Sequence, residues 1–157
     1  MPRMTLRNKP KKKILFALLV VAASWIGFAA PLAAQSAAVA SLTVRITGLS
    51  SAKGQVKIAL FNSSESWLGD HPAASSTVPV ESLTVTWKFS DIPQGDYGIA
   101  LFHDENKNGK MDKNFLGIPQ EAYGFSNNQR VVLGPPKWDK SKFAVKGSSS
   151  EISIEVK

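Results

Sequence analysis

The residues most able to do chemistry lie in one polar stretch between positions 103 and 112. Oxygen donors occupy alternate places there, with a glycine sixth and a backbone carbonyl seventh: Asp104, Asn106, Asn108, Gly109, Lys110 (through its carbonyl) and Asp112. Alternate side chains point inward and glycine permits a sharp turn, so this spacing is typical of the opening of an EF-hand-type calcium loop. The twelfth place, where a bidentate glutamate normally binds, is Phe115, so a donor such as Glu121 or Asn114 would be needed.

Two interpretations of this loop stay open. In the first, calcium binds weakly, with a dissociation constant on the order of 0.1 to 1 mM, because only Asp104 and Asp112 carry charge and lysines lie nearby. In the second, no ion binds, and the same side chains cap turns by accepting hydrogen bonds from backbone amides. A zinc site of nitrogen and sulfur ligands is disfavoured, since the chain has two histidines and no cysteine.

The sequence contains little that indicates an enzyme. A hydrolase needs a nucleophile with a base, or two carboxylates facing one cleft. Ser126 and His103, with Asp104 or Asp112, are the only set to nominate, and there is no nucleophile elbow, phosphate loop or zinc-protease helix. His103 is more typical of a structural histidine bonded to a neighbouring loop. We expect no catalytic site and no cofactor other than the candidate calcium ion.

The expected function is that of an exported, non-catalytic binding or structural module of the cell envelope. A secreted hydrolase and a carbohydrate-binding module are the alternatives. Four aromatic residues could stack on a sugar ring if they were exposed and coplanar: Trp67, Tyr123, Phe125 and Trp138. Single aromatic residues in β-sandwiches more often anchor loops against the sheet, and we expect that role here.

The first 34 residues have the organisation of a signal peptide. Six basic residues and no acid precede the apolar run 14–30, and small residues crowd the segment that follows. We expect cleavage between residues 34 and 40, which leaves one domain over residues 41–157 in the periplasm or outside the cell. The alternative is an uncleaved anchor, because this run has the minimum length for a membrane span, roughly 17 residues.

Removing the leader changes the expected partners. The full chain carries a net charge of +7, but thirteen basic residues then remain against twelve acidic ones. Nucleic-acid binding is therefore not expected, nor is stable membrane insertion after cleavage. With no cysteine for disulfides or a lipid anchor, we expect a monomer stabilised by burial, whose partner is an envelope protein or a glycan.

The elements that position the loop are predicted to be strands. Alternation of period two predicts strands at 42–47, 55–60, 97–103 and 151–156, one or two between 78 and 89, and short ones at 130–133 and 143–145. Residues 62–76 read as a loop, and no helix is predicted after the leader. About seven strands with frequent turns indicate an all-β antiparallel sandwich. Strand 97–103 is apolar on both faces, as a central strand is.

Several stretches resemble a family of secreted bacterial proteins, domain of unknown function 2141: residues 92–112, 117–121, 123–127 and 134–136. The likeness runs from about residue 42 to 156. It includes His103 and every candidate ligand in residues 104–112, which we call the acidic loop. Trp138 and Gln120 depart from the family's usual phenylalanine and basic residue. The family has no assigned activity, so the resemblance implies a fold and export. The turn at 93–97 is also similar to one in prealbumin-like sandwiches, which implies a prealbumin-like or Ig-like architecture.

Overall fold

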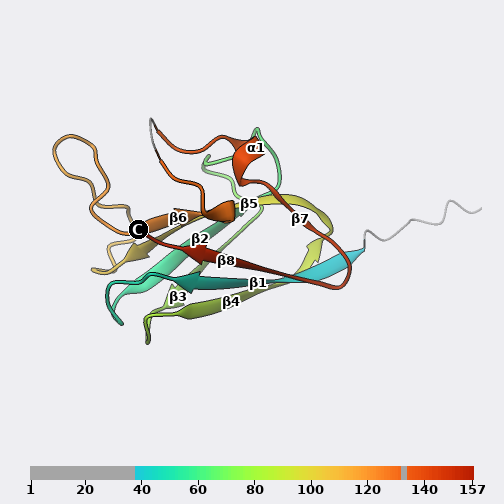
Figure 1. The fold of residues 1–157 in the computed structure, drawn as a ribbon, viewed down its shortest axis with the longest axis horizontal. Helices are drawn as coiled ribbons and strands as arrows, with labels where there is room; N and C mark the ends of the chain where they lie inside the picture. Colours follow the sequence, from blue (N-terminus) through green and yellow to red (C-terminus); the bar gives the residue numbers. More distant parts are fainter. Residues whose placement is uncertain (1–37, 132–133) are drawn as a thin grey trace, which may run out of the picture. The chain divides into compact units, whose positions relative to one another are not determined.

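The computed structural model describes residues 38–131 and 134–157, and Figure 1 shows their fold. They form eight strands, one helical turn and a 3-10 turn (η1): β1 (Val39–Thr47), β2 (Gln55–Phe61), β3 (Ala74–Pro79), β4 (Val85–Pro93), β5 (Gly95–Asp104), β6 (Tyr123–Phe125), η1 (Ser126–Asn128), α1 (Trp138–Ser141), β7 (Phe143–Val145) and β8 (Ser149–Glu155). The predicted signal peptide at 1–34 and the end of the predicted strand 130–133 lie outside the described residues.

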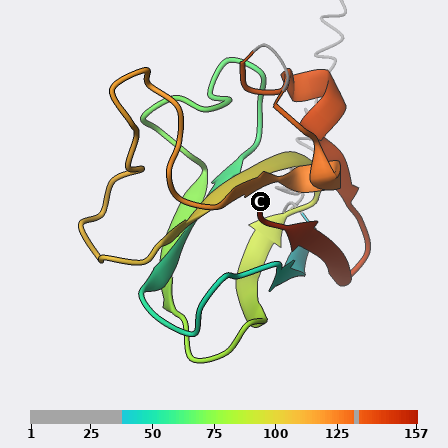
Figure 2. The same ribbon diagram turned by 60° about the vertical axis from the view of Figure 1, so that its left-hand side comes forward.

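The strands form two sheets that enclose one core, as Figures 1 and 2 illustrate from two directions. One sheet has the order β4-β1-β8, and the other has the order β3-β2-β5-β6, with β7 also pairing with β5. The predicted all-β sandwich is confirmed, with eight strands instead of about seven. One pairing among the described strands is parallel, between β1 and β8. It arises because the chain crosses from β7 to the other sheet before β8 begins.

The core follows from the alternation along each strand. In β1, Leu42, Val44 and Ile46 are buried, and Arg45 between them is exposed. Burying one such aliphatic side chain contributes roughly 1.5 to 3 kcal/mol. The facing sheet supplies the complementary apolar residues from β2 and β5: Val56, Ile58, Leu60, Tyr97, Ile99 and Leu101. The core thus lies between the sheets and spans residues 40–156.

Several elements differ from the sequence-based expectation: β3, β6, η1 and α1 were not predicted, and residues 130–131, predicted to begin a strand, form none. β3 begins at Ala74, inside the predicted loop 62–76, because the free edge of β2 offers it a backbone ladder. As an edge strand it needs only one buried side chain, Val78, so its sequence lacks a strong apolar pattern. The helix α1 was not predicted, since its four residues are too few to display a period of 3.6. No helix in the described ranges is long and apolar enough to cross a membrane.

β5 occupies the central position expected for it. It pairs with β2 on one side and with β6 and β7 on the other. Its outer face is covered near Gly98, where an added Cβ would lie 2.6 Å from Trp67 Cζ3 and 2.9 Å from Trp138 Cζ3. Glycine is therefore required for the indole rings to approach this strand. The acidic loop therefore begins at the end of β5, a strand that pairs with β2, β6 and β7.

Candidate functional site

The candidate site begins where β5 ends. His103 and Asp104 are fully buried, and the chain then leaves the sheet as an excursion over residues 105–122 that returns in β6. The backbone N–H of His103 donates to the carbonyl of Ala122 at 2.8 Å, which closes the base of the excursion. Gly54, at φ +74°, allows the β1–β2 connection to approach, since a Cβ there would lie 2.3 Å from the Asp104 carbonyl oxygen. This base fixes the direction in which the acidic loop leaves.

The carboxylate of Asp104 organises the loop from its buried end. Oδ1 accepts the backbone N–H of Asn108 at 3.0 Å, and Oδ2 accepts the N–H of Gly109 at 2.8 Å. Oδ2 also accepts Nε2 of Gln55 at 2.7 Å, from the paired strand β2. Burial alone would raise the pKa of Asp104, but the hydrogen bonds from Gln55 and from the backbone amides outweigh it and lower that pKa. Asp104 is thus a charged anchor inside the fold.

The other predicted side-chain ligands lie together around Asp112. Its Oδ2 accepts Nδ2 of Asn106 at 2.6 Å, and its Oδ1 accepts Nδ2 of Asn108 at 2.9 Å. The side-chain oxygens of the two asparagines accept backbone N–H groups, from Asn108 for Asn106 and from Lys110 for Asn108, at 3.0 and 2.8 Å. The structure therefore brings the predicted ligands into one loop, joined there by their own hydrogen bonds.

Glu121 and Asn114, the two residues named from the sequence as additional calcium donors, lie at different distances from the acidic loop. Glu121 is half-buried, and its carboxylate accepts the N–H of Glu105 at 3.3 Å and of Asp112 at 3.0 Å, so it ties the two ends of the loop together. Asn114 lies further out, where its side-chain oxygen closes a turn. Phe115 is 94% exposed and offers no side-chain oxygen. Of these positions, Glu121 alone places an oxygen on the acidic loop.

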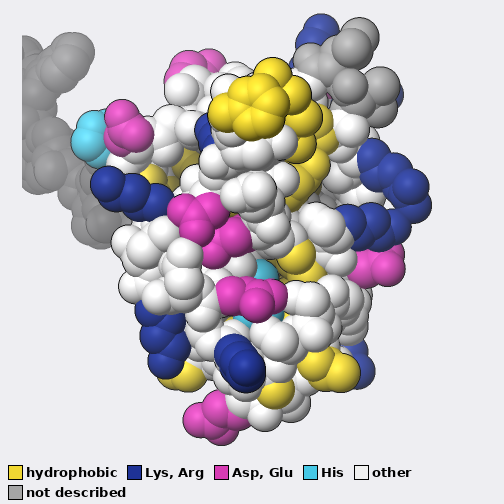
Figure 3. Space-filling model, turned by 90° about the vertical axis from the view of Figure 1, so that its left-hand side faces the viewer, with side chains coloured by type: hydrophobic (Ala, Val, Ile, Leu, Met, Phe, Trp, Pro, Cys, Tyr) yellow, Lys and Arg dark blue, Asp and Glu magenta, His cyan; other side chains and the backbone are white. Residues whose placement is uncertain are grey.

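A recess of about 520 Å³ opens beside the loop, lined among others by Asn106, Asp112 and Glu121. Figure 3 shows this end of the molecule, where acidic side chains lie near the middle of the face and also at its margins, among basic ones. Within the described ranges, no group of three or more His, Cys, Asp or Glu side chains is arranged to hold a metal ion. Any ion must therefore use amide and carbonyl oxygens beside two or three carboxylates, which is a donor set for calcium or magnesium.

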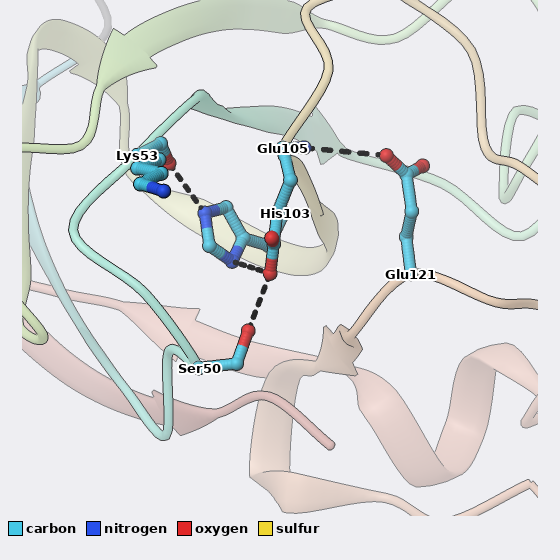
Figure 4. A network of polar contacts seen from close by, with 5 residues as sticks. All are labelled: Ser50, Lys53, His103, Glu105 and Glu121. Atoms are coloured by element: carbon cyan, nitrogen blue, oxygen red, sulfur yellow. Dashed lines mark hydrogen bonds and ion pairs between the residues drawn. The ribbon is translucent and has the colours of Figure 1, made fainter.

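His103 belongs to a network under the loop, drawn in Figure 4, that Glu105 and Glu121 connect to the acidic loop. Its Nε2 lies 2.7 Å from the carbonyl oxygen of Lys53, and since a carbonyl only accepts, Nε2 carries the proton. Its Nδ1 is buried without a hydrogen-bond partner, 3.6 Å from Oε1 of Glu105. The carboxylate of Glu105 accepts the hydroxyl of Ser50, which lowers its pKa, and the nearby His103 and Lys53 lower it further. Ser50 and Lys53 carry no sequence signal for this role, because their contacts exist only in the fold.

Comparison with known proteins gives a family. The profile of an uncharacterized protein family conserved in bacteria, DUF2141, matches residues 44–153. The chain belongs to this family. The match runs from β1 into β8 and includes both sheets and the whole acidic loop. No curated protein and no solved structure matches the chain.

In this DUF2141 chain, the structure does not assemble the hydrolase set named from the sequence. Ser126 is fully buried, and its hydroxyl accepts the N–H of Ile99 at 2.9 Å and donates to the carbonyl of Ser141 at 2.6 Å. Ile99 and His103 lie four residues apart along β5, a rise of about 13 Å at roughly 3.3 Å per residue. Ser126 therefore joins β5 to the α1 region and lies far from the imidazole.

The aromatic residues considered for sugar stacking form a cluster on the outer face of β5. Trp67 contacts Phe61, Phe125 and Trp138, with interplanar angles of 79°, 57° and 63°. Its Nε1 donates to the carbonyl of Pro136 at 2.8 Å, which holds two loops together. Tyr123 packs on Phe125 at 68°. These pairs are tilted or edge-on, so the cluster offers no coplanar platform for a sugar ring.

Proposed function

We propose that this chain is an exported, non-catalytic binding module of the bacterial cell envelope, whose acidic loop binds calcium weakly and is held in one conformation by it. One observation carries the proposal. The buried carboxylate of Asp104 accepts the amides of the fifth and sixth loop residues, Asn108 and Gly109, and the remaining candidate ligands lie together around Asp112. The candidate ligand residues are thus neighbours, within reach of one cation once the asparagine amides rotate.

The donor count suits a weak calcium site. Calcium takes six to eight oxygen ligands. The loop supplies side-chain oxygens from its two carboxylates and two amides, the carbonyl of Lys110 is a fifth donor, and Glu121 is a sixth. The amide nitrogens of Asn106 and Asn108 face Asp112 and donate hydrogen bonds to it. Both amide groups must rotate to present oxygen to a cation, and this cost favours a dissociation constant on the order of 0.1 to 1 mM.

We base the proposed export on the N-terminal leader. The position of the first strand agrees with removal of that leader. Ala40 is buried and pairs with Ile92 of β4. Cleavage after Ala34 leaves this pair intact, whereas cleavage after Ala40 removes it. A non-catalytic role is proposed because Ser126 and His103 each have a structural hydrogen bond and lie apart. A calcium-stabilised module in the periplasm or outside the cell would meet the millimolar ion concentrations that a weak site requires.

The test is thermal unfolding of the chain from Gln35, which contains the whole core, in 5 mM calcium and in excess chelator, with magnesium as a second cation. An ion at ten times its dissociation constant stabilises the folded state by about 1.4 kcal/mol. For a domain of this size the expected rise in Tm is about 4 to 8 °C. Calorimetric titration with calcium measures the same affinity directly.

Matched variants locate the site. Asp112→Asn keeps the size of a half-buried side chain but removes a charged ligand, so the calcium-dependent rise should disappear while Tm in chelator changes little. Asp96→Asn removes an exposed carboxylate at the other end of β5 and should retain the full rise. Superimposed curves in calcium and chelator for the unmodified chain contradict the proposal and leave a loop capped by its own side chains.

A further inference from the structure

Large apolar side chains are exposed on a turn at the tip of the excursion 105–122. Phe115 is 94% exposed, Leu116 is 67% exposed and Ile118 is 55% exposed. Single exposed apolar residues are ordinary on a protein surface, but a group of three that includes an aromatic residue marks an interaction site. The acidic loop at the base of the excursion does not involve these side chains.

The turn that carries them is held by its own hydrogen bonds. The side-chain oxygen of Asn114 accepts the N–H groups of Leu116 and Ile118, both at 3.0 Å. The N–H of Asn114 donates to the carbonyl of Ile118, and the N–H of Gly117 donates to the carbonyl of Asn114, both at 2.9 Å. An isolated bridge between Lys113 and Pro119 closes the stem. The apolar side chains therefore project from a formed turn.

The lysines near this turn are more exposed than most of the acids of the same excursion. Lys107, Lys110 and Lys113 are exposed, and none of them forms a salt bridge within the described residues. Of the acids, Asp104 is fully buried, Asp112 is half-buried and accepts hydrogen bonds from two asparagines, and Glu105 is exposed at the base of the excursion, where its carboxylate accepts the hydroxyl of Ser50. The apolar tip thus has cationic neighbours, while Figure 3 shows hydrophobic groups standing out on this face.

We propose that the turn 114–118 docks the protein reversibly on the surface of an anionic phospholipid bilayer. Phe115 and Leu116 enter the boundary between headgroups and acyl chains, and the three lysines lie among the lipid phosphates. A protein partner is less suited to this surface, because a stable interface buries about 800 Å² on each side and a single turn offers much less. The docking contact involves no spanning segment and does not depend on calcium binding.

The experiment is flotation of the chain from Gln35 with vesicles, in chelator, so that failure of the calcium site leaves the outcome unchanged. Vesicles of equal parts phosphatidylglycerol and phosphatidylcholine should bind the protein, and vesicles of phosphatidylcholine alone should bind it much less. Phe115→Ser should lower the partition coefficient about tenfold or more, because a phenyl group leaves the bilayer boundary. Each Lys→Gln change at 107, 110 or 113 should lower it about fivefold, an effect that salt reduces.

Val39→Ser is the control variant, since Val39 is 51% exposed at the start of β1, away from the tip. It should bind vesicles as the unmodified chain does, and circular dichroism should give the same Tm for all variants. The proposal is overturned if anionic vesicles do not bind the chain, or if Phe115→Ser and Val39→Ser bind equally well. It is also overturned if sedimentation without lipid reveals a dimer that Phe115→Ser abolishes, because the occupant of the tip is then a second copy.

Discussion

Replacing Asp104 tests whether a buried charge holds the acidic loop in place. Asp104→Ala removes the acceptor for the amides of Asn108 and Gly109 and for the side chain of Gln55. Hydrogen bonds to a charged group contribute about 1.5 to 3 kcal/mol each. Because Asn108 and Gly109 are exposed, water can satisfy part of the loss, so the lower end of that range applies. We expect a loss of about 3 to 5 kcal/mol, a large part of the roughly 5 to 15 kcal/mol typical of a domain.

The pH dependence of stability provides a second signature. The pKa of Asp104 is lowered in the folded state, so its stabilising contribution is present above the unfolded pKa of about 3.9 and is lost as pH falls through the folded pKa. Asp104→Asn keeps the side-chain size and lacks this ionisation. The unmodified chain should therefore lose more stability than Asp104→Asn as pH falls below about 4. Glu105, whose pKa is also lowered, is common to both proteins and cancels in the difference.

The assay is urea unfolding of the chain from Gln35, followed by circular dichroism and tryptophan fluorescence at neutral pH and at steps down to about pH 2. At neutral pH, Asp104→Ala should lower the free energy of unfolding by about 3 to 5 kcal/mol, which in a thermal scan corresponds to a Tm lower by about 10 to 20 °C. Asp96→Ala, an exposed carboxylate on the same strand, should change stability by no more than about 0.5 kcal/mol. A loss below about 1 kcal/mol for Asp104→Ala, or equal acid sensitivity of Asp104→Asn and the unmodified chain, would refute the anchoring role.

Two further stability predictions follow from buried contacts. Ser126→Ala should lower the free energy of unfolding by about 2 kcal/mol, because the N–H of Ile99 loses its buried acceptor. Hydrogen exchange at that amide should become faster. Unchanged protection from exchange would contradict the proposed role of Ser126 in joining β5 to α1. Gly98→Ala should lower the free energy of unfolding by about 1 to 3 kcal/mol, because the new methyl group meets the rings of Trp67 and Trp138. The tryptophan fluorescence spectrum should shift as well. An unchanged spectrum and unchanged stability would mean that the rings move aside freely.

The sandwich could be predicted from the sequence because its main strands are half-buried. Alternation at Leu42, Val44 and Ile46 reports a single buried face, and the same pattern recurs in β2 and β8. The edge strand β3 and the short strand β6 could not be predicted, because their backbone partners determine them more than their own side chains do. The parallel pairing of β8 depends on a crossover between sheets, which no local pattern records.

The candidate site could be predicted in part. The spacing from Asp104 to Asp112 places the polar groups of one loop, and the structure brings them together. The spacing gives no sign that Asp104 is completely buried, since the β1–β2 connection approaches it at Gly54, whereas His103 ends a strand expected to be buried on both faces. The network with Ser50 has the same origin. These contacts join residues about fifty positions apart, which only the folded sheets bring together.

Both carboxylates of the acidic loop are proposed calcium ligands, but only Asp104 also anchors the fold, and this difference makes folding and ion binding distinguishable. Asp104 accepts three hydrogen bonds without any ion, so it stabilises the loop in calcium and in chelator alike. Asp112 is bonded mainly to asparagine amides that must turn away before a cation can bind. Asp104→Asn should therefore lower stability in both media, whereas Asp112→Asn should remove only the calcium-dependent part. If both variants lost the calcium effect and neither lost stability in chelator, the loop would be organised by the ion and not by its buried anchor.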